Sequence, residues 1–250
     1  VQTCALPISF CTESALSGIK QQVRNMAYRR SFTVPASWSG KRVKLNFGAV
    51  DWKCSVWVDG DSVGAHQGGY DPFSLDITSK VKPGTEQTLV VRVYDPTDAD
   101  SNPRGKQVSR PGGIFYTSCS GIWQTVWMEA VAATYISDLR IIPDVDKEQI
   151  TVTVTARGDN AANANVQLKA MHGTTEVSQV EGAAGAALVL PISKPDLWSP
   201  DHPFLYDLQV TLTDNQGNTD QVISYFGMRK VSLAPWGSNR WQIHLNNKFL

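Results

Sequence analysis

The feature that most constrains this chain is a two-residue alternation of apolar and polar side chains, repeated in short segments. Residues 150–157 read ITVTVTAR, in which every second residue is apolar until the end of the segment. An extended strand turns successive side chains to opposite faces, so this pattern predicts a strand with one buried face. Turn-forming residues separate such segments along nearly the whole chain. We therefore predict an all-β protein.

The first half carries the signals of a sandwich rich in hairpins. Residues 43–47 read VKLNF and alternate in the same way, and residues 53–58 form a second apolar segment. Asp59-Gly60 follows, a pair that supplies the positive φ angles of a tight hairpin turn. Later in this half come two more segments with strand composition, 88–94 and 121–131. Short strands separated by such turns are typical of a β-sandwich with jelly-roll topology.

The composition changes after Val131, and a second series of strands begins. Alternating segments recur at 150–157, 166–170 and 208–212. The turn residues DNQGN at 214–218 lead into a last predicted strand, 222–228. About seven short strands over roughly a hundred residues indicate an immunoglobulin-like sandwich. The sequence thus predicts two sandwiches in series, with a boundary near residue 133.

The composition fits this division and argues against several kinds of partner. The chain has 250 residues, enough for two domains that each bury a core. Lysine plus arginine and aspartate plus glutamate both number 23, so no net charge attracts nucleic acid or an anionic membrane. The sequence has no apolar run of about 18 residues that would predict a transmembrane helix. We expect neither nucleic acid nor a membrane as a partner.

The cysteines and histidines predict neither a metal site nor a cofactor. The four cysteines and four histidines form no C-x-x-C pair and no cluster with the spacing of metal ligands. Cys54 lies in a predicted strand, where a thiol behaves as a small apolar side chain. This usage fits both a reducing compartment and an exported protein without disulfides. The sequence therefore predicts no cellular location.

A long connection between two predicted strands invites a functional interpretation. Residues 95–120 read DPTDADSNPRGKQVSRPGGIFYTSCS, and connections of this length are usually functional or disordered. The segment combines carboxylates, cations, an amide and aromatic rings, the groups that hydrogen-bond to sugars and stack on them. We take the following as candidates for the rim of a substrate site: Asp95, Asp98, Arg104, Lys106 and Gln107. The alternative is a packing loop that joins the sandwich to another domain.

A second group, Gly68-Gly69-Tyr70, has two interpretations. The tyrosine beside two glycines suggests a platform for a sugar ring. The glycines also suit a corner in the backbone, because glycine adopts positive φ without strain. Pro72 favours the corner, since proline cannot donate a hydrogen bond to a β-ladder.

Three stretches resemble one enzyme family. They are residues 41–76, residues 112–131 with the signature Ser120-Gly121-Ile122, and residues 240–250, RWQIHLNNKFL. The first two resemble the sugar-binding jelly roll, of the galactose-binding-like type, at the front of glycoside hydrolase family 2 enzymes. These enzymes are β-galactosidases, β-glucuronidases and β-mannosidases. The third stretch resembles the lead-in to their catalytic barrel.

The resemblance implies a division of the chain. Residues 9–133 are expected to be the jelly-roll domain and residues 134–234 the immunoglobulin-like domain, which residues 197–212 resemble as well. Residues 235–250 are expected to lead into a (β/α)₈ barrel that this sequence does not include. Residues 1–8, VQTCALPI, match one reading frame of a sequencing-library adapter, and we interpret them as an artefact.

No catalytic residue is predicted within this chain. Retaining hydrolysis of a glycoside requires two carboxyl groups about 5–5.5 Å apart. None of the six glutamates stands in a motif of the family's barrel, and the 17 aspartates offer no pair that we would propose. The histidines lie on different predicted elements, without a nucleophile motif beside them. We expect the chain alone to hydrolyse no glycoside.

The resemblance implies a function for the longer parent protein. We expect this chain to be the N-terminal, non-catalytic portion of a β-glycosidase acting on β-galactosides or β-glucuronides. Its partners would be the carbohydrate substrate and the C-terminal barrel of the same chain. In β-galactosidases of the family a jelly-roll loop offers an aspartate to the substrate or a nearby cation, and that aspartate falls on Asp98. The alternatives are a non-catalytic carbohydrate-binding or adhesion protein of two sandwiches and a structural spacer.

Overall fold

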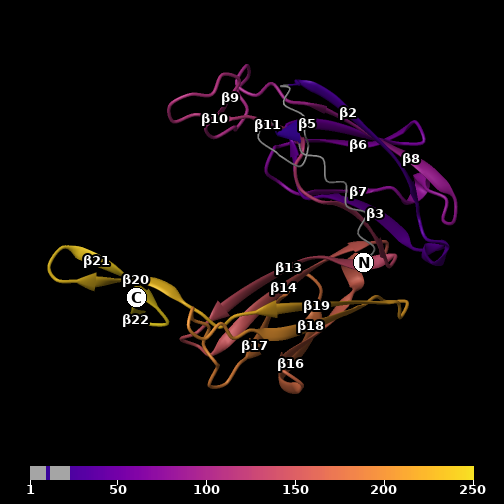
Figure 1. Ribbon diagram of the computed structural model, residues 1–250. Helices are drawn as coiled ribbons and strands as arrows, with labels where there is room; N and C mark the ends of the chain where they lie inside the picture. The colour runs from indigo at the N-terminus through magenta and orange to yellow at the C-terminus, as the bar shows by residue number, and fades with distance from the viewer. Residues whose placement is uncertain (1–9, 12–22) are drawn as a thin grey trace. The chain divides into compact units, whose positions relative to one another are not determined.

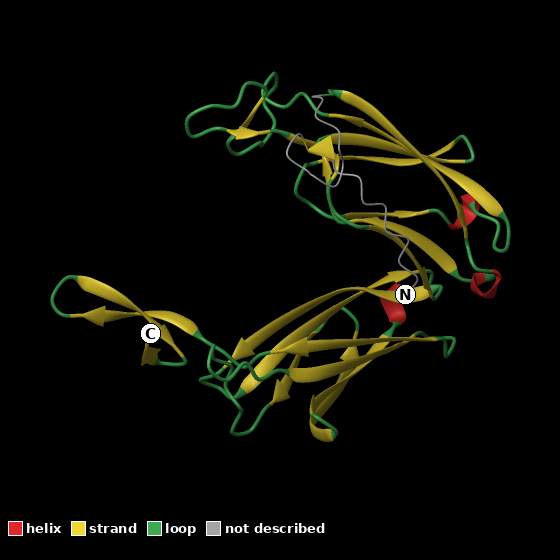
Figure 2. Ribbon diagram, viewed as in Figure 1, coloured by secondary structure: helices red, strands yellow, loops and turns green. Residues whose placement is uncertain are grey.

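The computed structural model describes residues 10–11 and 23–250, and its regular secondary structure is almost wholly β-strand (Figures 1 and 2). The helices among these residues are three short 3₁₀ turns: η1 (Ala36–Trp38), η2 (Thr78–Lys80) and η3 (Ala161–Asn163). The prediction of an all-β protein is confirmed. Residues 1–8, which we interpret as an artefact, lie outside the described residues. In the described part of the chain, no helix is long and apolar enough to cross a membrane.

The chain divides into two compact units, Val1–Val131 and Ala132–Leu250. The first unit is a sandwich of two antiparallel sheets with a core between them. One sheet has the order β2 (Asn25–Thr33), β8 (Glu86–Tyr94), β5 (Lys53–Val58), β6 (Asp61–Gln67). The other has the order β12 (Val126–Val131), β3 (Arg42–Phe47), β7 (Phe73–Asp76). The predicted jelly-roll sandwich is therefore confirmed.

The local patterns explain these strands. In β5 the alternate residues Cys54, Val56 and Val58 are buried, as their two-residue spacing predicts. The predicted hairpin joins β5 to β6, and Asp59 and Gly60 have φ angles of 49° and 88°. Three short strands lie near one end of this sandwich, β9 (Gln107–Val108), β10 (Tyr116–Thr117) and β11 (Cys119–Ile122), and β11 pairs with β4 (Val50–Asp51). They position the candidate site. β11 also pairs with β1 (Phe10–Cys11).

The second unit contains the predicted immunoglobulin-like sandwich of seven strands. One sheet has the order β13 (Thr134–Asp144), β14 (Gln149–Gly158), β17 (Ala187–Pro191). The other has the order β16 (Thr175–Ala183), β15 (Asn165–His172), β18 (Tyr206–Thr213), β19 (Thr219–Phe226). The alternating segment at 150–157 forms β14, and its residues Ile150, Val152 and Val154 are at most 1% exposed. The predicted strand 222–228 ends earlier, at Phe226, and Met228 instead forms an isolated bridge with Leu197.

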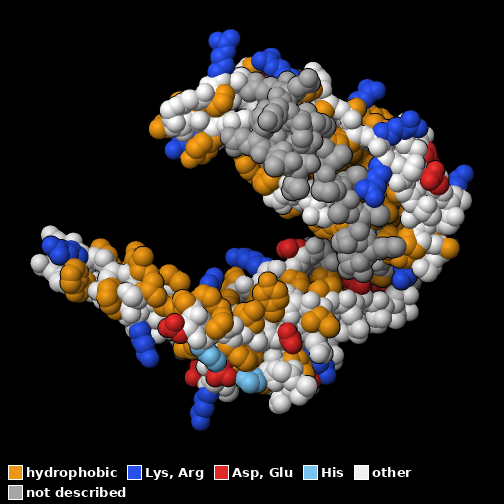
Figure 3. Space-filling model, viewed as in Figure 1, with side chains coloured by type: hydrophobic (Ala, Val, Ile, Leu, Met, Phe, Trp, Pro, Cys, Tyr) orange, Lys and Arg blue, Asp and Glu red, His pale blue; other side chains and the backbone are white. Residues whose placement is uncertain are grey.

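A ribbon of three strands completes the second unit: β20 (Val231–Trp236), β21 (Arg240–Leu245) and β22 (Lys248–Phe249). In the β20–β21 register, Val231 lies opposite Leu245, Leu233 opposite Ile243 and Pro235 opposite Trp241. Residues directly opposite or two apart share a face, so this face of the ribbon is entirely apolar. Leu233 and Trp241 are 65% and 67% exposed. Figure 3 shows hydrophobic side chains along this ribbon.

The base of the ribbon is tied to the rest of the second unit. The Asn246 side chain donates from Nδ2 to the Trp198 carbonyl (3.0 Å), and its Oδ1 accepts from the Lys230 N–H (3.0 Å). Lys230 Nζ lies 2.5 Å from the Asp146 carboxylate. These contacts hold residues near the start and the end of the ribbon together, so the ribbon has a fixed base although its apolar face is exposed.

Candidate functional site

The connection Asp95–Ser120 leaves β8 and returns at β11, and its short strands β9 and β10 pair in parallel. Figure 1 shows β9 and β10 as a lobe beside β11, at one end of the first sandwich. The corner at 67–72, after β6, contributes Tyr70, and the segment between β11 and β12 contributes Trp123. These three segments form the candidate functional site.

Asp95 lies beneath the surface of this site. It is 2% exposed, and its carboxylate accepts hydrogen bonds from the Ser120 hydroxyl and from the Thr97 N–H (2.7 Å). Ser120 is at the far end of the connection. The carboxylate thus joins the two ends of the loop, and it has almost no surface open to solvent.

Asp98 closes the middle of the connection. Its carboxylate accepts hydrogen bonds from the Ser109 hydroxyl and from the Ser109 N–H (3.1 Å). These bonds, with a smaller contribution from the positive charge of Arg104, lower the pKa of Asp98. Asp98 is therefore ionised at neutral pH. It remains partly exposed, and so does Arg104.

Gln107 links the connection to the corner. Its Oε1 accepts from the Cys119 N–H (2.5 Å), and its Nε2 donates to the Tyr70 hydroxyl (3.4 Å). The neighbouring Lys106 is exposed, with Nζ 5.7 Å from the centre of the Tyr116 ring. The structure thus places Asp95 inside the domain, and the other four predicted residues at least partly exposed.

The structure adds two residues to the site, Tyr70 and Trp123. Their ring centroids lie 6.1 Å apart with an interplanar angle of 72°, an edge-to-face pair. Tyr70 is 47% exposed and Trp123 38% exposed. The Trp123 indole N–H donates to the Gly69 carbonyl (2.7 Å). The pattern Gly-Gly-Tyr pointed to Tyr70, whereas nothing in the sequence separated Trp123 from the other tryptophans.

The sequence allows the Gly-Gly-Tyr group to be a backbone corner or a platform for a sugar ring, and the structure has features of both. Gly68 has a φ of 142°, as a corner requires. A Cβ added to Gly69 would lie 2.6 Å from Asp51 Oδ1, so a side chain does not fit there without a shift. The glycines therefore form a corner, and the corner presents Tyr70 to solvent.

Asp51 lies behind this corner, on β4 opposite Gly121. It is 5% exposed, and its Oδ1 has no hydrogen-bond partner among the described residues. Burial, together with the negative charge of Asp95, raises the pKa of Asp51 to about 7. The site therefore has an acidic interior beneath an aromatic surface.

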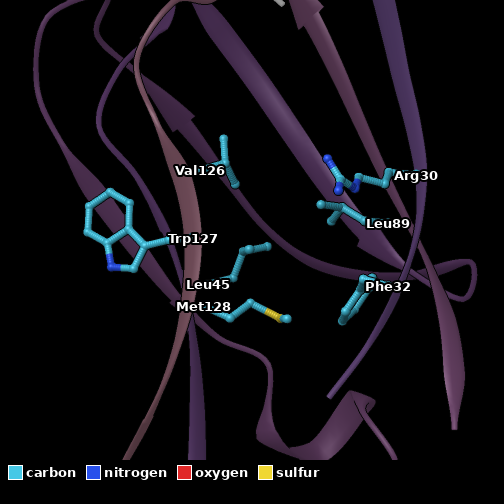
Figure 4. A pocket seen from close by; sticks show the side chains of 7 residues that line it. All are labelled: Arg30, Phe32, Leu45, Leu89, Val126, Trp127 and Met128. Carbon is cyan, nitrogen blue, oxygen red and sulfur yellow. The ribbon is translucent and has the colours of Figure 1, made fainter. Parts of the chain in front are cut away.

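Two other features of the described residues do not form a site. An apolar hollow opens between the sheets of the first sandwich, lined by Arg30, Phe32, Leu45, Leu89, Val126, Trp127 and Met128 (Figure 4). The Trp127 indole is turned to the other side of its strand. The hollow lacks the convergent polar groups of a sugar site, and we assign no ligand to it. Among residues 10–11 and 23–250, no group of three or more His, Cys, Asp or Glu side chains could hold a metal ion.

Comparison with known proteins gives a consistent result for both halves. The profile of "Glycosyl hydrolases family 2, sugar binding domain" matches residues 5–128, and that of "Glycosyl hydrolases family 2" matches residues 134–229. A β-galactosidase of Thermoanaerobacter pseudethanolicus is 30% identical over 227 residues, which are 84% of this chain and 29% of the relative. A β-glucuronidase of Paenibacillus borealis is 27% identical over 243 residues, which are 91% of this chain and 40% of the relative.

A solved structure supports the same fold. A β-glucuronidase from Ruminococcus gnavus in complex with D-glucuronic acid aligns with a TM-score of 0.78 and 22% identity, over 98% of this chain and 42% of that chain. The chain spans less than half the length of each of these three proteins. The two profiles cover most of the sequence in the order jelly roll, then immunoglobulin-like sandwich, and this chain therefore belongs to glycosyl hydrolase family 2.

Proposed function

We propose that this chain is the N-terminal, non-catalytic portion of a β-glycosidase that hydrolyses β-galactosides or β-glucuronides. The observation that carries the proposal is the order and extent of the match. Two consecutive family 2 domains fill residues 5–229, yet the chain spans only 29% and 40% of the β-galactosidase and the β-glucuronidase relatives. The remainder of the parent would supply the catalytic groups.

The buried carboxylates support a non-catalytic role. Glycoside hydrolysis needs one carboxyl group to protonate the leaving oxygen and another to attack or activate water. Asp51 and Asp95 interact electrostatically, but they are 5% and 2% exposed. A glycosidic oxygen has no access to either. Asp98 is accessible, but Ser109 holds its carboxylate in place.

The ribbon supports the barrel as a partner within the same chain. A small sheet needs its apolar face packed against another element to be stable, and an exposed apolar patch usually marks an interface. Four large side chains of the ribbon's apolar face are more than half exposed: Val231, Leu233, Trp241 and Ile243. We infer that the catalytic barrel of the parent covers this face.

The candidate site would contribute to the rim of the parent's active site. Active sites of such barrels lie at the carboxyl ends of the strands, where a neighbouring domain can complete the pocket. Asp98, Arg104, Lys106 and Gln107 are the groups that would contact a sugar. Asp95 would act through the closure of the loop.

The test compares the longer parent with residues 1–250 on aryl β-galactoside, β-glucuronide and β-mannoside. We expect the parent to release aglycone from a galactoside or a glucuronide, and the 1–250 chain to show only background. Binding without two positioned carboxyl groups does not supply both proton transfer and attack. A parent that is inactive on all three substrates would contradict the proposal. Turnover by 1–250 that a single Asp or Glu substitution abolishes would contradict it as well.

A further inference from the structure

We propose that Tyr70 and Trp123 form a platform on the first sandwich that binds the apolar face of a neutral pyranose ring. This inference rests on the proposed function for the class of ligand, and its location rests on the geometry of the two rings. The profile that matches residues 5–128 is named a sugar binding domain, and the proposal places a binding surface at two residues within it.

The exposure of the two rings is the first argument. Single apolar side chains are common on protein surfaces, whereas paired aromatic rings with large exposed areas mark binding sites more often. Tyr70 and Trp123 are 47% and 38% exposed although they contact each other. Their interplanar angle of 72° turns the two rings nearly at right angles in an edge-to-face contact. One sugar ring can stack on one face and meet the other at its edge.

The rigidity of the pair is the second argument. Trp123 is held through its indole N–H by the Gly69 carbonyl, and Tyr70 through its hydroxyl by Gln107. The Cys119 N–H in turn holds the Gln107 side chain. Three segments of the chain thus fix two exposed side chains. Fixing them in advance lowers the conformational entropy that ligand binding must remove.

The surrounding polar groups define the ligand. The flat faces of tyrosine and tryptophan cover C–H groups, while the Tyr70 hydroxyl and the Gln107 amide can exchange hydrogen bonds with sugar hydroxyls. Burial, and then the negative charges of Asp51 and Asp95, raise the pKa of Tyr70. The negative charge of Asp95, buried beneath the two rings, would repel the carboxylate of a uronic acid. The chemistry therefore favours a neutral hexopyranoside, such as a β-galactoside.

The experiment uses the ¹⁵N-labelled 1–250 chain titrated with methyl β-D-galactopyranoside and, separately, with methyl β-D-glucopyranosiduronate. The indole N–H signal of Trp123 is assigned by its loss in Trp123→Phe. We expect a saturable shift of this signal with the galactoside and a weaker response to the uronide. Tyr70→Ala should weaken galactoside binding at least about tenfold, equivalent to about 1.4 kcal/mol. Tyr70→Phe keeps the ring and should retain most of the binding.

The matched control is Tyr225→Ala, which removes a 66% exposed tyrosine from β19 of the second unit. It should leave galactoside binding unchanged. An unshifted Trp123 signal, equal binding by Tyr70→Ala and the parent chain, or tighter binding of the uronide would each overturn the proposal. If the parent hydrolyses glycosides while this platform binds none, only the platform fails. If the platform binds while the parent is inactive, only the proposed function fails.

Discussion

Asp51 is a buried carboxyl group whose charged form is unfavourable in this fold. Its Oδ1 has no hydrogen-bond partner among the described residues, Gly69 leaves no room for a larger neighbour, and Asp95 carries a second negative charge nearby. A buried carboxylate without a partner is unfavourable, so the neutral acid is the preferred form. With a pKa of about 7, Asp51 titrates near neutral pH.

This pKa predicts that the first unit loses stability as the pH rises. The folded state holds the Asp51 proton up to about pH 7, whereas the unfolded chain releases it near the ordinary value of 3.8. The free energy of unfolding should therefore fall between these two values, by roughly 2–4 kcal/mol at about 1.4 kcal/mol per pKa unit. Urea unfolding of the 1–250 chain across this range measures the fall.

The Asp51→Asn variant serves as the control, because its side chain does not titrate. Its stability should depend much less on pH over the same range. Four carboxyl groups have a lowered pKa and add stability as the pH rises, but only up to about pH 5: Asp76, Asp98, Asp146 and Asp214. The fall caused by Asp51 is therefore measured between about pH 5 and about pH 7. Identical pH profiles for the variant and the original chain would show that Asp51 is not the titrating group.

At the scale of elements, the connection Asp95–Ser120 has two candidate roles: contact with the substrate and closure of the loop. The Asp98 carboxylate is bound by Ser109, so it could serve the loop, the substrate or both. Hydrogen bonds to a charged group contribute about 1.5–3 kcal/mol. A carboxylate that contacts the sugar in the transition state therefore has a measurable effect on catalysis.

We expect Asp98→Ala in the parent enzyme to lower kcat/KM by roughly one to two decades, since about 1.4 kcal/mol is tenfold in rate. Ser109→Ala is the matched variant, because it removes one hydrogen bond of the loop and keeps the carboxylate. It should reduce kcat/KM much less. Steady-state kinetics and thermal unfolding of both variants distinguish a substrate contact from a purely structural role of Asp98. Unchanged kinetics with a lowered Tm in Asp98→Ala would make the loop a structural strap.

Much of the strand structure could be predicted from the sequence, because alternation and turn chemistry are local properties. The hairpin at Asp59-Gly60 and the strand at 150–157 are examples. The candidate site depends on contacts between distant residues, and local patterns do not contain these. Trp123 meets Gly69 across more than fifty positions. The burial of Asp95 could not be predicted from the sequence either, because an aspartate in a loop is normally solvated.

Gly121 illustrates the same limit within a recognised motif. The sequence marked Ser120-Gly121-Ile122 as a signature by resemblance alone. In the structure Gly121 has a φ of 89°, and a Cβ added to it would lie 2.1 Å from the Tyr28 hydroxyl oxygen. The Ile122 N–H donates to that same oxygen (3.2 Å). Glycine is required because β11 passes directly over the side chain of a tyrosine on β2.

At the scale of the whole molecule, each unit has its own core, and the ribbon lies outside both. The two sandwiches therefore have what they need to fold from their own residues. The ribbon does not, since its apolar face contributes to neither core. The proposed catalytic barrel of the parent is the partner that we expect to cover it.

We expect Trp241→Lys to have a different effect in the parent and in the 1–250 chain. In the parent it should lower the Tm, because it places a charge in a covered apolar interface. In the 1–250 chain it should reduce binding of a hydrophobic dye, because it breaks an exposed patch. Trp236→Lys is the control, since Trp236 is also 55% exposed but lies on the other face. Equal effects of the two substitutions in both proteins would contradict the proposal that the parent covers the apolar face of the ribbon.

The proline in β20 restricts the manner in which the ribbon can be covered. β20 is an edge strand, and edge strands offer unpaired N–H and C=O groups to any strand that approaches. Pro235 has no N–H, and a proline within a ladder stands where its nitrogen faces the open side. A strand added along this edge would lose one hydrogen bond near its end. Growth of the sheet along the β20 edge is thereby discouraged, and a partner on that side is directed to the face of the ribbon, where side chains rather than backbone make the contact.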